Sequence, residues 1–373
     1  MLVVMIADLA HANPMLLLTC GDPAGIGPEI VAAAWNRPAA HRGAVLRVVA
    51  EAPLLEAVLA RRAGLPAATV EAIEPGDPRP SQPGRILVLE PARIGDAIGQ
   101  EIRTPDATPD AIDDAVISAA GGRAAAVAVE AAAAATLAGL AAGIVTGPLH
   151  KEALHAAGYD VPGHTELLAR ACGLADEAAS MMLWLPGAGG RADLGVVHAT
   201  LHESLRTAVE RLSTAGIEAA GGRLAAGLAG LLGRRPRLAV AALNPHGGEG
   251  GLFGDEEQRL IEPAVARLAA AGIDVAGPLP ADTLFLRAFA GEFDGVVALY
   301  HDQGHIPVKL IGMHRAVNIT LGLPLVRTSV AHGTAFDIVG RGRADPASLL
   351  AAIEAAGRIV RHRGVRAASA PGS

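Results

Sequence analysis

The sequence is poor in aromatic residues and in basic charge. Phe, Trp and Tyr make up 2% of its 373 residues, so it has few side chains that could stack on the bases of a single-stranded nucleic acid. The formal net charge is -7, and no long run of Lys and Arg is present. Both features argue against a nucleic-acid partner, and any anion site must be local.

Cysteine is also scarce. Cys20 and Cys172 are the two in the chain, which excludes a metal site of four thiolates and fits a reducing cytoplasm. The apolar residues 1–14 lack the basic region of a secretion signal and are too short to span a membrane. We therefore expect a cytoplasmic protein without a membrane partner. We treat residues 1–14 and 366–373 as disordered or over-long ends.

The residues that are abundant predict an α/β fold. The chain is 51% hydrophobic, and its 45 Gly and 25 Pro suit many short turns between strands and helices. Apolar runs typical of buried strands alternate with Ala-rich segments that favour helices, such as residues 111–139. The length is enough for two lobes, each with its own core.

Histidines recur at the ends of strand-like runs. Four such runs, each followed by polar residues, are 295–300 before His301 and Asp302, 237–243 before His246, 193–197 before His198 and His202, and 142–147 before His150 and Lys151. A single histidine there is more often an ordinary loop residue. Because ligands bind beyond the carboxyl ends of parallel strands, the recurrence favours one shared site.

Several other polar residues have both an ordinary and a functional interpretation. The turn 21–28 is rich in glycine without being a GxGxxG fingerprint, so it is either a plain turn or a backbone approach to an anion. Lys151 is either exposed or a partner for an anion or a proton. His164 and Thr165 open a helix and suit a phosphate. Asp282 is equally well explained as a helix cap and as a metal ligand.

At these positions the motifs resemble those of the 4-hydroxythreonine-4-phosphate dehydrogenase family of vitamin B6 biosynthesis. The resemblance extends from Met15 to about Arg361. It is carried by GDPAGIGPE, TGPLHKEAL, GHTELLA, LNPHGGEGG, PADTLF, YHDQGHIP, VNITLGLP and RTSVAHGTAFDIVGRG, in that order.

The resemblance implies a two-lobed α/β/α sandwich of the isocitrate and isopropylmalate dehydrogenase type. We place one lobe at 15–145 plus 325–365 and the other, with the metal and substrate residues, at 146–324. The family works as a homodimer with a shared active site. It uses NAD or NADP and one divalent metal ion per site, for which zinc, magnesium, manganese and cobalt are the candidates.

The resemblance also assigns individual residues. The metal ligands fall on His202, His246 and His301, and Asp282 joins from a neighbouring subunit. The substrate groups fall on His164, Thr165, Lys309, Asn318 and Arg327, and the cofactor contacts on His332, Gly333, Thr334 and Asp337. Lys151 is our candidate for proton transfer.

The function so implied is NAD(P)-dependent oxidation, with decarboxylation, of a phosphorylated hydroxy acid, in the first place 4-phosphohydroxy-L-threonine. Three departures from the motifs of the family leave the identity of the substrate open. Ala331 stands where many members have Asp, Leu201 separates Thr200 from His202, and GHIP is more similar to a paralogous branch. That branch acts on 4-phospho-D-threonate, 4-phospho-D-erythronate or a cis-diol carboxylate.

Three other classes remain as rivals. A metal-dependent hydrolase or lyase would work without nicotinamide. An acyltransferase similar to phosphate acetyltransferases would work without the metal histidines. A non-catalytic binding protein would not need both the metal histidines and the HGTAFD loop, residues 332–337. We rank this class last.

Overall fold

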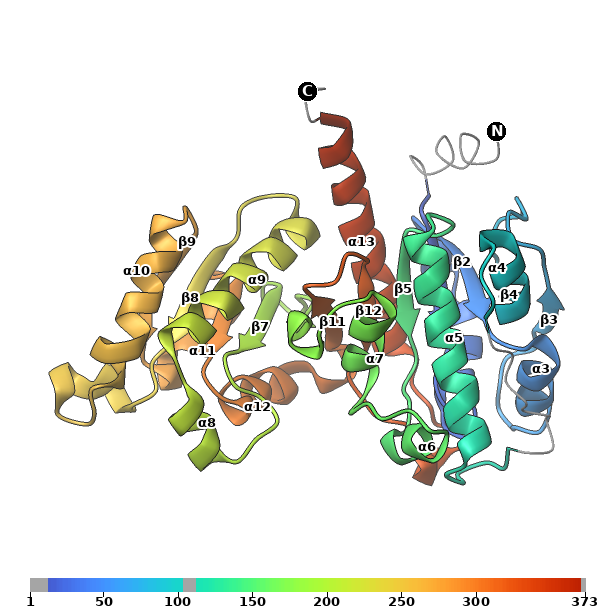
Figure 1. The fold of residues 1–373 in the computed structure, drawn as a ribbon, viewed down its shortest axis with the longest axis horizontal. Coiled ribbons are helices and arrows are strands. Elements are labelled where there is room, and N and C mark those ends of the chain that lie inside the picture. The colour runs from blue at the N-terminus through green and yellow to red at the C-terminus, as the bar shows by residue number, and fades with distance from the viewer. Residues whose placement is uncertain (1–12, 103–111, 370–373) are drawn as a thin grey trace. The chain divides into compact units, whose positions relative to one another are not determined.

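The computed structural model describes residues 13–102 and 112–369, with side chains up to Arg363. It forms two compact α/β units (Figure 1). Unit 1 contains the described residues up to Ala179 and from Leu323 onward, and unit 2 is Ser180–Gly322. The predicted α/β class is confirmed.

Unit 1 is built on a parallel sheet. Each strand pairs in parallel with its neighbours, in the order β3, β4, β2, β1, β5, β12. The strands are β1 (Met15–Thr19), β2 (Val45–Val49), β3 (Thr69–Ala72), β4 (Arg85–Leu89), β5 (Gly143–Thr146) and β12 (Arg327–Val330).

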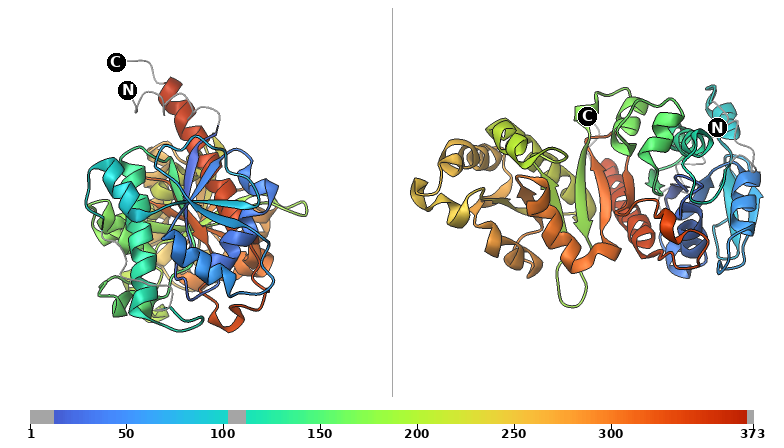
Figure 2. Two further views of the ribbon diagram at one scale, coloured as in Figure 1. Left: turned by 90° about the vertical axis from the view of Figure 1, so that its right-hand side faces the viewer. Right: turned by 90° about the horizontal axis from the view of Figure 1, so that it is seen from below.

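Helices cover this sheet on both sides (left view of Figure 2). The helices of unit 1 are α2 (Gly27–Trp35), α3 (Ala52–Ala60), α4 (Pro91–Ile98), α5 (Ala119–Leu137), α6 (Lys151–Ala156), α7 (His164–Ala171) and α13 (Ala347–Ser369). The central strands are therefore buried on both faces, which explains why they are almost purely apolar runs such as MLLLT.

Unit 2 has a mixed sheet in the order β11, β6, β7, β10, β8, β9. The pairs of β6 with β11 and with β7 are antiparallel, and the remaining pairs are parallel. The strands are β6 (Ser180–Leu185), β7 (Leu194–His198), β8 (Arg237–Ala241), β9 (Asp274–Leu279), β10 (Gly295–Ala298) and β11 (Val317–Leu321).

The helices of unit 2 are α8 (Leu205–Arg211), α9 (Thr214–Leu232), α10 (Glu262–Ala270), α11 (Ala281–Phe289) and α12 (His301–Gly312). On β7, Gly195 faces Leu228 of α9, whereas the next residue, Val196, faces Gly304 of α12. Because successive strand residues point to opposite faces, α9 and α12 cover opposite faces of this sheet. Short turns of 3₁₀ helix and one π turn, Glu257–Ile261, complete the fold.

The division between the units differs from the lobes expected from the sequence. Residues 146–179, expected with the second lobe, belong to unit 1. The physical reason is packing, because α6 and α7 pack on α5 of unit 1. The contact with α6 is so close that a Cβ on Gly122 would lie 1.9 Å from the Ala153 carbonyl oxygen.

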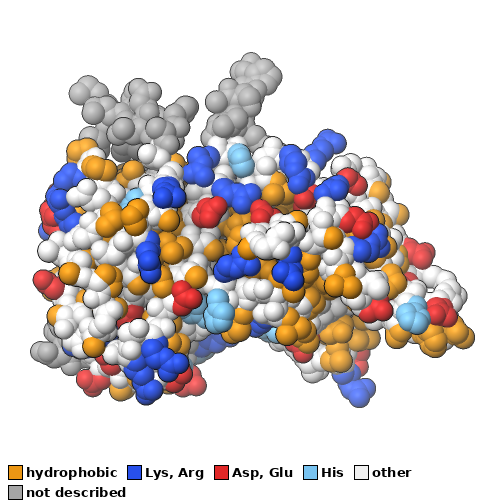
Figure 3. Space-filling view, turned by 180° about the vertical axis from the view of Figure 1, so that it is seen from behind, with side chains coloured by type: hydrophobic (Ala, Val, Ile, Leu, Met, Phe, Trp, Pro, Cys, Tyr) orange, Lys and Arg blue, Asp and Glu red, His pale blue; other side chains and the backbone are white. Residues whose placement is uncertain are grey.

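The chain ends 1–14 and 366–373 lie mostly outside the described residues, although α13 continues to Ser369. In the part of the chain that the structure describes, no helix has the length and hydropathy of a membrane span. On the face drawn in Figure 3, acidic and basic side chains are scattered among hydrophobic and neutral ones.

Candidate active site

Three histidine-bearing strand ends lie together in unit 2. Strand β10 pairs in parallel with β7 on one side and with β8 on the other, so their carboxyl ends share one edge of the sheet. Gln303 joins two of these ends. Its Oε1 accepts from the Leu299 amide at 2.7 Å, and its Nε2 donates to the Ala242 carbonyl at 2.8 Å.

His301 is the first residue of α12 and directly follows this edge. Its Nδ1 lies 2.6 Å from Oδ1 of Asp302. An ionised carboxylate can only accept, so Nδ1 carries the proton and Nε2 keeps its lone pair. This pairing is the usual way in which proteins orient a metal-binding imidazole.

His246 has the same kind of partner. Its Nδ1 lies 2.7 Å from Oε1 of Glu249 within the turn Pro245–Gly251. Both residues have positive φ, +54° and +44°, in a backbone region that non-glycine residues rarely occupy. Such strain is typical of functional loops, and here it brings the carboxylate onto the imidazole.

The strained turn is anchored at its start by Glu257. Its Oε1 accepts from the backbone amides of Leu243 and Asn244 at 2.9 and 2.8 Å. Burial acts to raise the pKa of Glu257, but the hydrogen bonds from these two residues outweigh it and leave that pKa below its ordinary value.

His202 and His301 line one cleft of about 550 Å³, with ring centroids 5.9 Å apart. The other lining residues come from the segment before α8, from α8 itself and from the start of α12: Leu201, Glu203, Ser204, Leu205, Ala208, Tyr300 and Asp302. His202 is exposed to this space. The cleft is large enough for a small organic acid.

The donor chemistry of these residues fits a divalent metal ion. His246 and His301 are held in the tautomer that leaves Nε2 free, and imidazole nitrogen suits zinc, cobalt and related ions. Among the described residues, no three His, Cys, Asp or Glu side chains stand in metal-holding geometry within one chain. The ligand assignment therefore stays a prediction.

The other predicted residues of unit 2 occupy different elements. Asp282 is exposed in the first turn of α11, where Pro280 and not Asp282 is the N-cap residue. Lys309 is exposed on α12. Asn318 lies on β11, and its Oδ1 is buried without a hydrogen-bond partner. A buried acceptor without a donor is one that a ligand could satisfy.

Unit 1 contains a buried guanidinium, that of Arg327 on β12, which is 2% exposed. Its Nε and Nη2 donate to Oγ1 of Thr146, at 3.1 and 2.7 Å. Burial lowers the pKa of Arg327 to about 9, while the charge of Glu166 acts in the opposite direction. A bound anion would favour the charged form in the same way.

His164 and Thr165 begin α7, the helix that also carries Glu166. The His164 Nε2 is enclosed and has no hydrogen-bond partner. Burial, and secondarily the positive charge of Arg327, hold the pKa of His164 well below its ordinary value. A neutral imidazole beside a guanidinium at a helix start can donate a hydrogen bond to a phosphate oxygen.

The predicted cofactor loop, 332–337, packs on the Gly-rich turn after β1. The Ile26 amide donates to the Thr334 carbonyl at 3.0 Å, and a Cβ on Gly25 would lie 2.9 Å from the Thr334 Cβ. Gly333 differs, because a Cβ added there would meet no atom within 4 Å. Its backbone can therefore be approached by a ligand.

The remaining predicted residues of unit 1 belong to this loop or are exposed on α6. His332 is partly buried, and its Nδ1 lies 2.9 Å from the Gly333 carbonyl, whereas Asp337 is exposed. Phe336 stacks on His150 with ring centroids 5.2 Å apart. Lys151, the first residue of α6, is exposed, so its role in proton transfer stays a prediction.

The chain matches one known protein family over most of its length. Residues 46–356 match the family described as pyridoxal phosphate biosynthetic protein PdxA. The chain belongs to the PdxA family.

Its relatives carry two different substrate names. The D-threonate 4-phosphate dehydrogenase of Salmonella typhimurium is 42% identical over 340 residues, covering 91% of this chain and 97% of that protein. The 4-hydroxythreonine-4-phosphate dehydrogenase of Beijerinckia indica is 44% identical over 346 residues, covering 92% and 94%.

A crystal structure of 4-hydroxythreonine-4-phosphate dehydrogenase from Klebsiella pneumoniae is similar to this chain. It has 40% sequence identity and a TM-score of 0.80, covering 94% of this chain and 98% of that one. The PdxA chain described here is thus an oxidoreductase that acts on a CH–OH group. Family membership implies a nicotinamide cofactor and a divalent metal in general terms.

Two histidines next to His301 have no role in the sequence-based assignment. His305 lies four residues after His301 on α12, and its Nδ1 lies 3.1 Å from Nε2 of His198 at the end of β7. Burial, followed by the charges of neighbouring groups, lowers the pKa of His198 to about 3 and that of His305 to about 4. The i, i+4 spacing in HDQGH is the sequence signal that could have identified His305.

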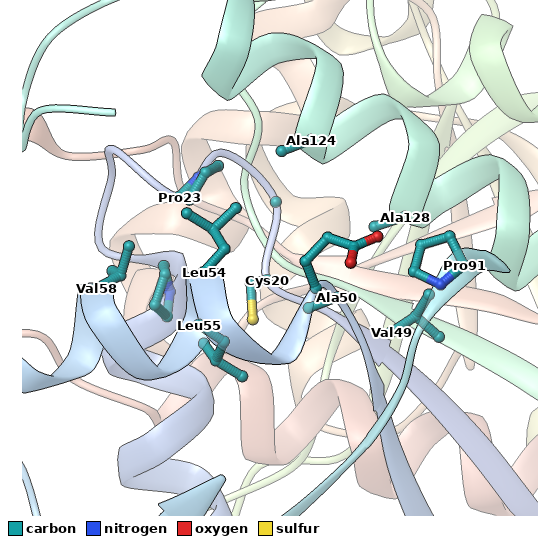
Figure 4. A pocket seen from close by; sticks show the side chains of 13 residues that line it. Cys20, Pro23, Val49, Ala50, Leu54, Leu55, Val58, Pro91, Ala124 and Ala128 are labelled. Carbon is teal, nitrogen blue, oxygen red and sulfur yellow. The ribbon is translucent and has the colours of Figure 1, made fainter. Parts of the chain in front are cut away.

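A second pocket, in unit 1, lies at the carboxyl ends of β1, β2 and β4 (Figure 4). Its volume of about 30 Å³ is near that of a single water, and most of its walls are apolar. Cys20 lines it, and burial raises the pKa of this thiol to about 12, so the sulfur stays protonated. This pocket is not a site for nucleophilic chemistry.

Proposed function

We propose that this PdxA-family chain catalyses the NAD(P)-dependent, metal-dependent oxidation, with decarboxylation, of a phosphorylated hydroxy acid. The observation that carries the proposal is the pair of carboxylate-supported imidazoles, His246 and His301, after neighbouring parallel strands. Hydrolases and lyases can also use such imidazoles, but those alternatives do not account for membership in a family of dehydrogenases.

We assign metal binding to residues of unit 2. His202, His246 and His301 would supply three neutral nitrogens, each through one ring atom. When bound, a divalent ion would lower the pKa of a coordinated substrate hydroxyl, and a nicotinamide would supply the hydride acceptor. The two carboxylates Asp302 and Glu249 hold the imidazole tautomers that this role needs.

We assign binding of the phosphate to residues of unit 1. Arg327 offers a planar, buried guanidinium, and His164 and Thr165 offer donors at a helix start. Lys309 and Asn318 of unit 2 would contact the remaining polar groups of the substrate. The loop His332, Gly333, Thr334 and Asp337 would contact the dinucleotide, which the open backbone at Gly333 supports.

The first candidate substrate is 4-phosphohydroxy-L-threonine, because the name of the Beijerinckia indica relative contains 4-hydroxythreonine-4-phosphate. The second is D-threonate 4-phosphate, as named for the Salmonella typhimurium relative at nearly the same identity. Both acids carry a phosphate, a carboxylate and a secondary hydroxyl, so the same set of donors serves either. They differ at the carbon next to the carboxylate, which carries an amino group in the first acid and a hydroxyl in the second.

We further propose a homodimer in which Asp282 of one subunit completes the site of the other. Apolar side chains are exposed on α8 and α12, the two helices at the cleft that His202 and His301 line. A second subunit could cover them there. Leu205 on α8 is 60% exposed, and Ile306 and Leu310 on α12 are 53% and 80% exposed.

The first experiment separates the candidate substrates. Purified, metal-loaded protein is given NAD or NADP and, in turn, 4-phosphohydroxy-L-threonine, D-threonate 4-phosphate, D-erythronate 4-phosphate and a non-phosphorylated cis-diol carboxylate. Formation of NADH or NADPH is followed by absorbance. Turnover of a phosphorylated acid supports the proposal, and turnover of only the cis-diol would contradict it.

The metal assignment is tested by His246→Ala. We expect loss of tight metal binding and of turnover together, because one of three ligands and its carboxylate support are removed. The matched control is His155→Ala, which removes an exposed histidine of α6 outside the proposed sites. A His246→Ala protein that keeps both metal and activity would sink the assignment.

A further inference from the structure

His305 lies on α12 between two residues of the proposed site. It lies on the same face of the helix as His301 and Lys309, four residues after the first and four before the second. It is 6% exposed, whereas Ile306 and Leu310 beside it are largely exposed. An imidazole is therefore buried between a proposed metal ligand and a proposed substrate contact.

The hydrogen bonds fix the proton positions of this imidazole and its partner. The His305 Nδ1 lies 3.2 Å from the His301 carbonyl oxygen, which can only accept, so Nδ1 carries a proton. The same N–H points to His198 Nε2 at 3.1 Å, which must then be an acceptor. The proton of a neutral His198 is consequently on Nδ1.

The three rings form a packed stack. The rings of His301 and His305 are 3.8 Å apart between centroids and 10° from parallel, and those of His198 and His305 are 4.7 Å apart. The close approach depends on Gly304, because a Cβ there would lie 2.4 Å from His198 Nε2. The plane of the His301 ring is thus supported on one side by His305.

Packing alone does not account for the choice of histidine. The His198 Nδ1 is enclosed and has no hydrogen-bond partner in the structure. A buried N–H left unsatisfied costs about 1–3 kcal/mol, a penalty that an apolar side chain of similar size would avoid. The pair therefore carries an energetic cost that a role in the neighbouring site would explain.

We propose that His305 and His198 are positioning residues for His301, which hold its ring plane and the first turn of α12 so that Nε2 faces the metal ion. The inference rests on the proposed function, because it takes His301 as a metal ligand. Neither residue needs to touch the metal or the substrate. The pair acts through a hydrogen bond to the His301 backbone and a ring stack on its side chain.

The test measures metal affinity separately from activity. Full-length protein is stripped of metal, and Zn²⁺ and Co²⁺ binding is measured by competition with a chromogenic chelator. The visible absorption spectrum of the Co²⁺ form reports the ligand geometry. His305→Leu removes the donor, whereas His305→Asn places an amide N–H near the position of Nδ1.

We expect His305→Leu to weaken metal binding about 10–100-fold and to change the Co²⁺ spectrum, as is typical for residues behind a metal ligand. We expect His305→Asn to recover most of the affinity. At saturating metal, His305→Leu should lower kcat with little change in the substrate KM. Unchanged affinity and an unchanged spectrum in His305→Leu would overturn the inference.

A second pair of variants keeps the test decisive if His305→Leu does not fold. His198→Leu removes the acceptor of the hydrogen bond, and His198→Gln keeps an acceptor near the position of Nε2. Loss in the first with recovery in the second supports the inference, and equal affinities contradict it. A wild-type protein that binds no metal contradicts the proposed function instead, so the two failures can be distinguished.

Discussion

At the scale of single residues, the carboxylates Asp302 and Glu249 determine how the site can work. Each accepts a hydrogen bond from Nδ1 of a proposed metal ligand, at 2.6 and 2.7 Å. The accepting oxygens fix the tautomers of His301 and His246, and they increase the basicity of the ring nitrogen that remains. These two carboxylates therefore support the proposed metal site as much as the histidines themselves do.

Replacing Asp302 tests this support directly. We expect Asp302→Ala to weaken Zn²⁺ affinity about 10–100-fold while leaving the thermal midpoint of the metal-free protein within a few degrees, because the side chain is exposed. Chelator competition and calorimetry measure the two quantities. Asp255→Ala, which removes another exposed carboxylate, is the control. Equal Zn²⁺ affinity in both variants would contradict the supporting role.

Arg327 gives a second prediction at this scale. We expect Arg327→Met to raise the KM for the phosphorylated substrate about 10–100-fold, since each hydrogen bond to a charged group contributes about 1.5–3 kcal/mol. The thermal midpoint should change by only a few degrees, because the removal of a buried charge is offset by the loss of two hydrogen bonds to the buried Thr146 Oγ1. Initial rates and calorimetry test both, with exposed Arg37→Met as control. An unchanged KM would remove Arg327 from the phosphate site.

The sequence points to some of these residues and not to others, for physical reasons. His301 and His246 could be found because each follows an apolar strand, a pattern that is visible in the chain. The partnership of His246 with Glu249 depends on two positive φ angles, which propensity does not reveal. His305 was missed because its partner, His198, is 107 residues away in the chain.

At the scale of elements, the strands were predicted better than the limits of the helices and units. Apolar runs ending in polar residues correspond to β5, β7, β8 and β10. The Ala-rich segment 111–139 was expected to be one helix, but α5 is Ala119–Leu137 and begins at the Ser118 cap, whose Oγ accepts from Gly121. Residues 146–179 belong to unit 1 because α6 and α7 pack on α5, and a local sequence pattern cannot show such packing.

Helix α9 offers a matched pair of glycines for testing how helices pack within a unit. A Cβ on Gly222 would meet no atom within 4 Å, whereas a Cβ on Gly221 would lie 2.6 Å from Cδ1 of Leu268 on α10. We expect Gly222→Ala to stabilise the fold by about 0.5–1 kcal/mol through helix propensity. Gly221→Ala should destabilise it by about 1–3 kcal/mol through overpacking.

Thermal or urea unfolding of the two variants measures the difference. Each replacement adds the same methyl group to the same helix, so propensity cancels in the comparison and the contact with Leu268 remains. Equal stability of the two variants would show that α10 is not packed on α9 as the structure has it.

At the scale of the whole molecule, the proposed dimer leads to a prediction that would not hold for a monomer. In the proposed arrangement, one subunit supplies the histidines of a site and its partner supplies Asp282. Exposure of Asp282 in the first turn of α11 leaves its carboxylate available for such a contact. A single chain would then lack one side chain of its own site.

Subunit mixing tests this arrangement with two variants that should each be inactive, His301→Asn and Asp282→Asn. In a hybrid dimer, one site receives both defects, and the other receives intact histidines from one subunit and intact Asp282 from its partner. After random exchange, about a quarter of the wild-type activity should therefore return. If Asp282 served its own subunit, both sites of every hybrid would be defective and the mixture would stay inactive.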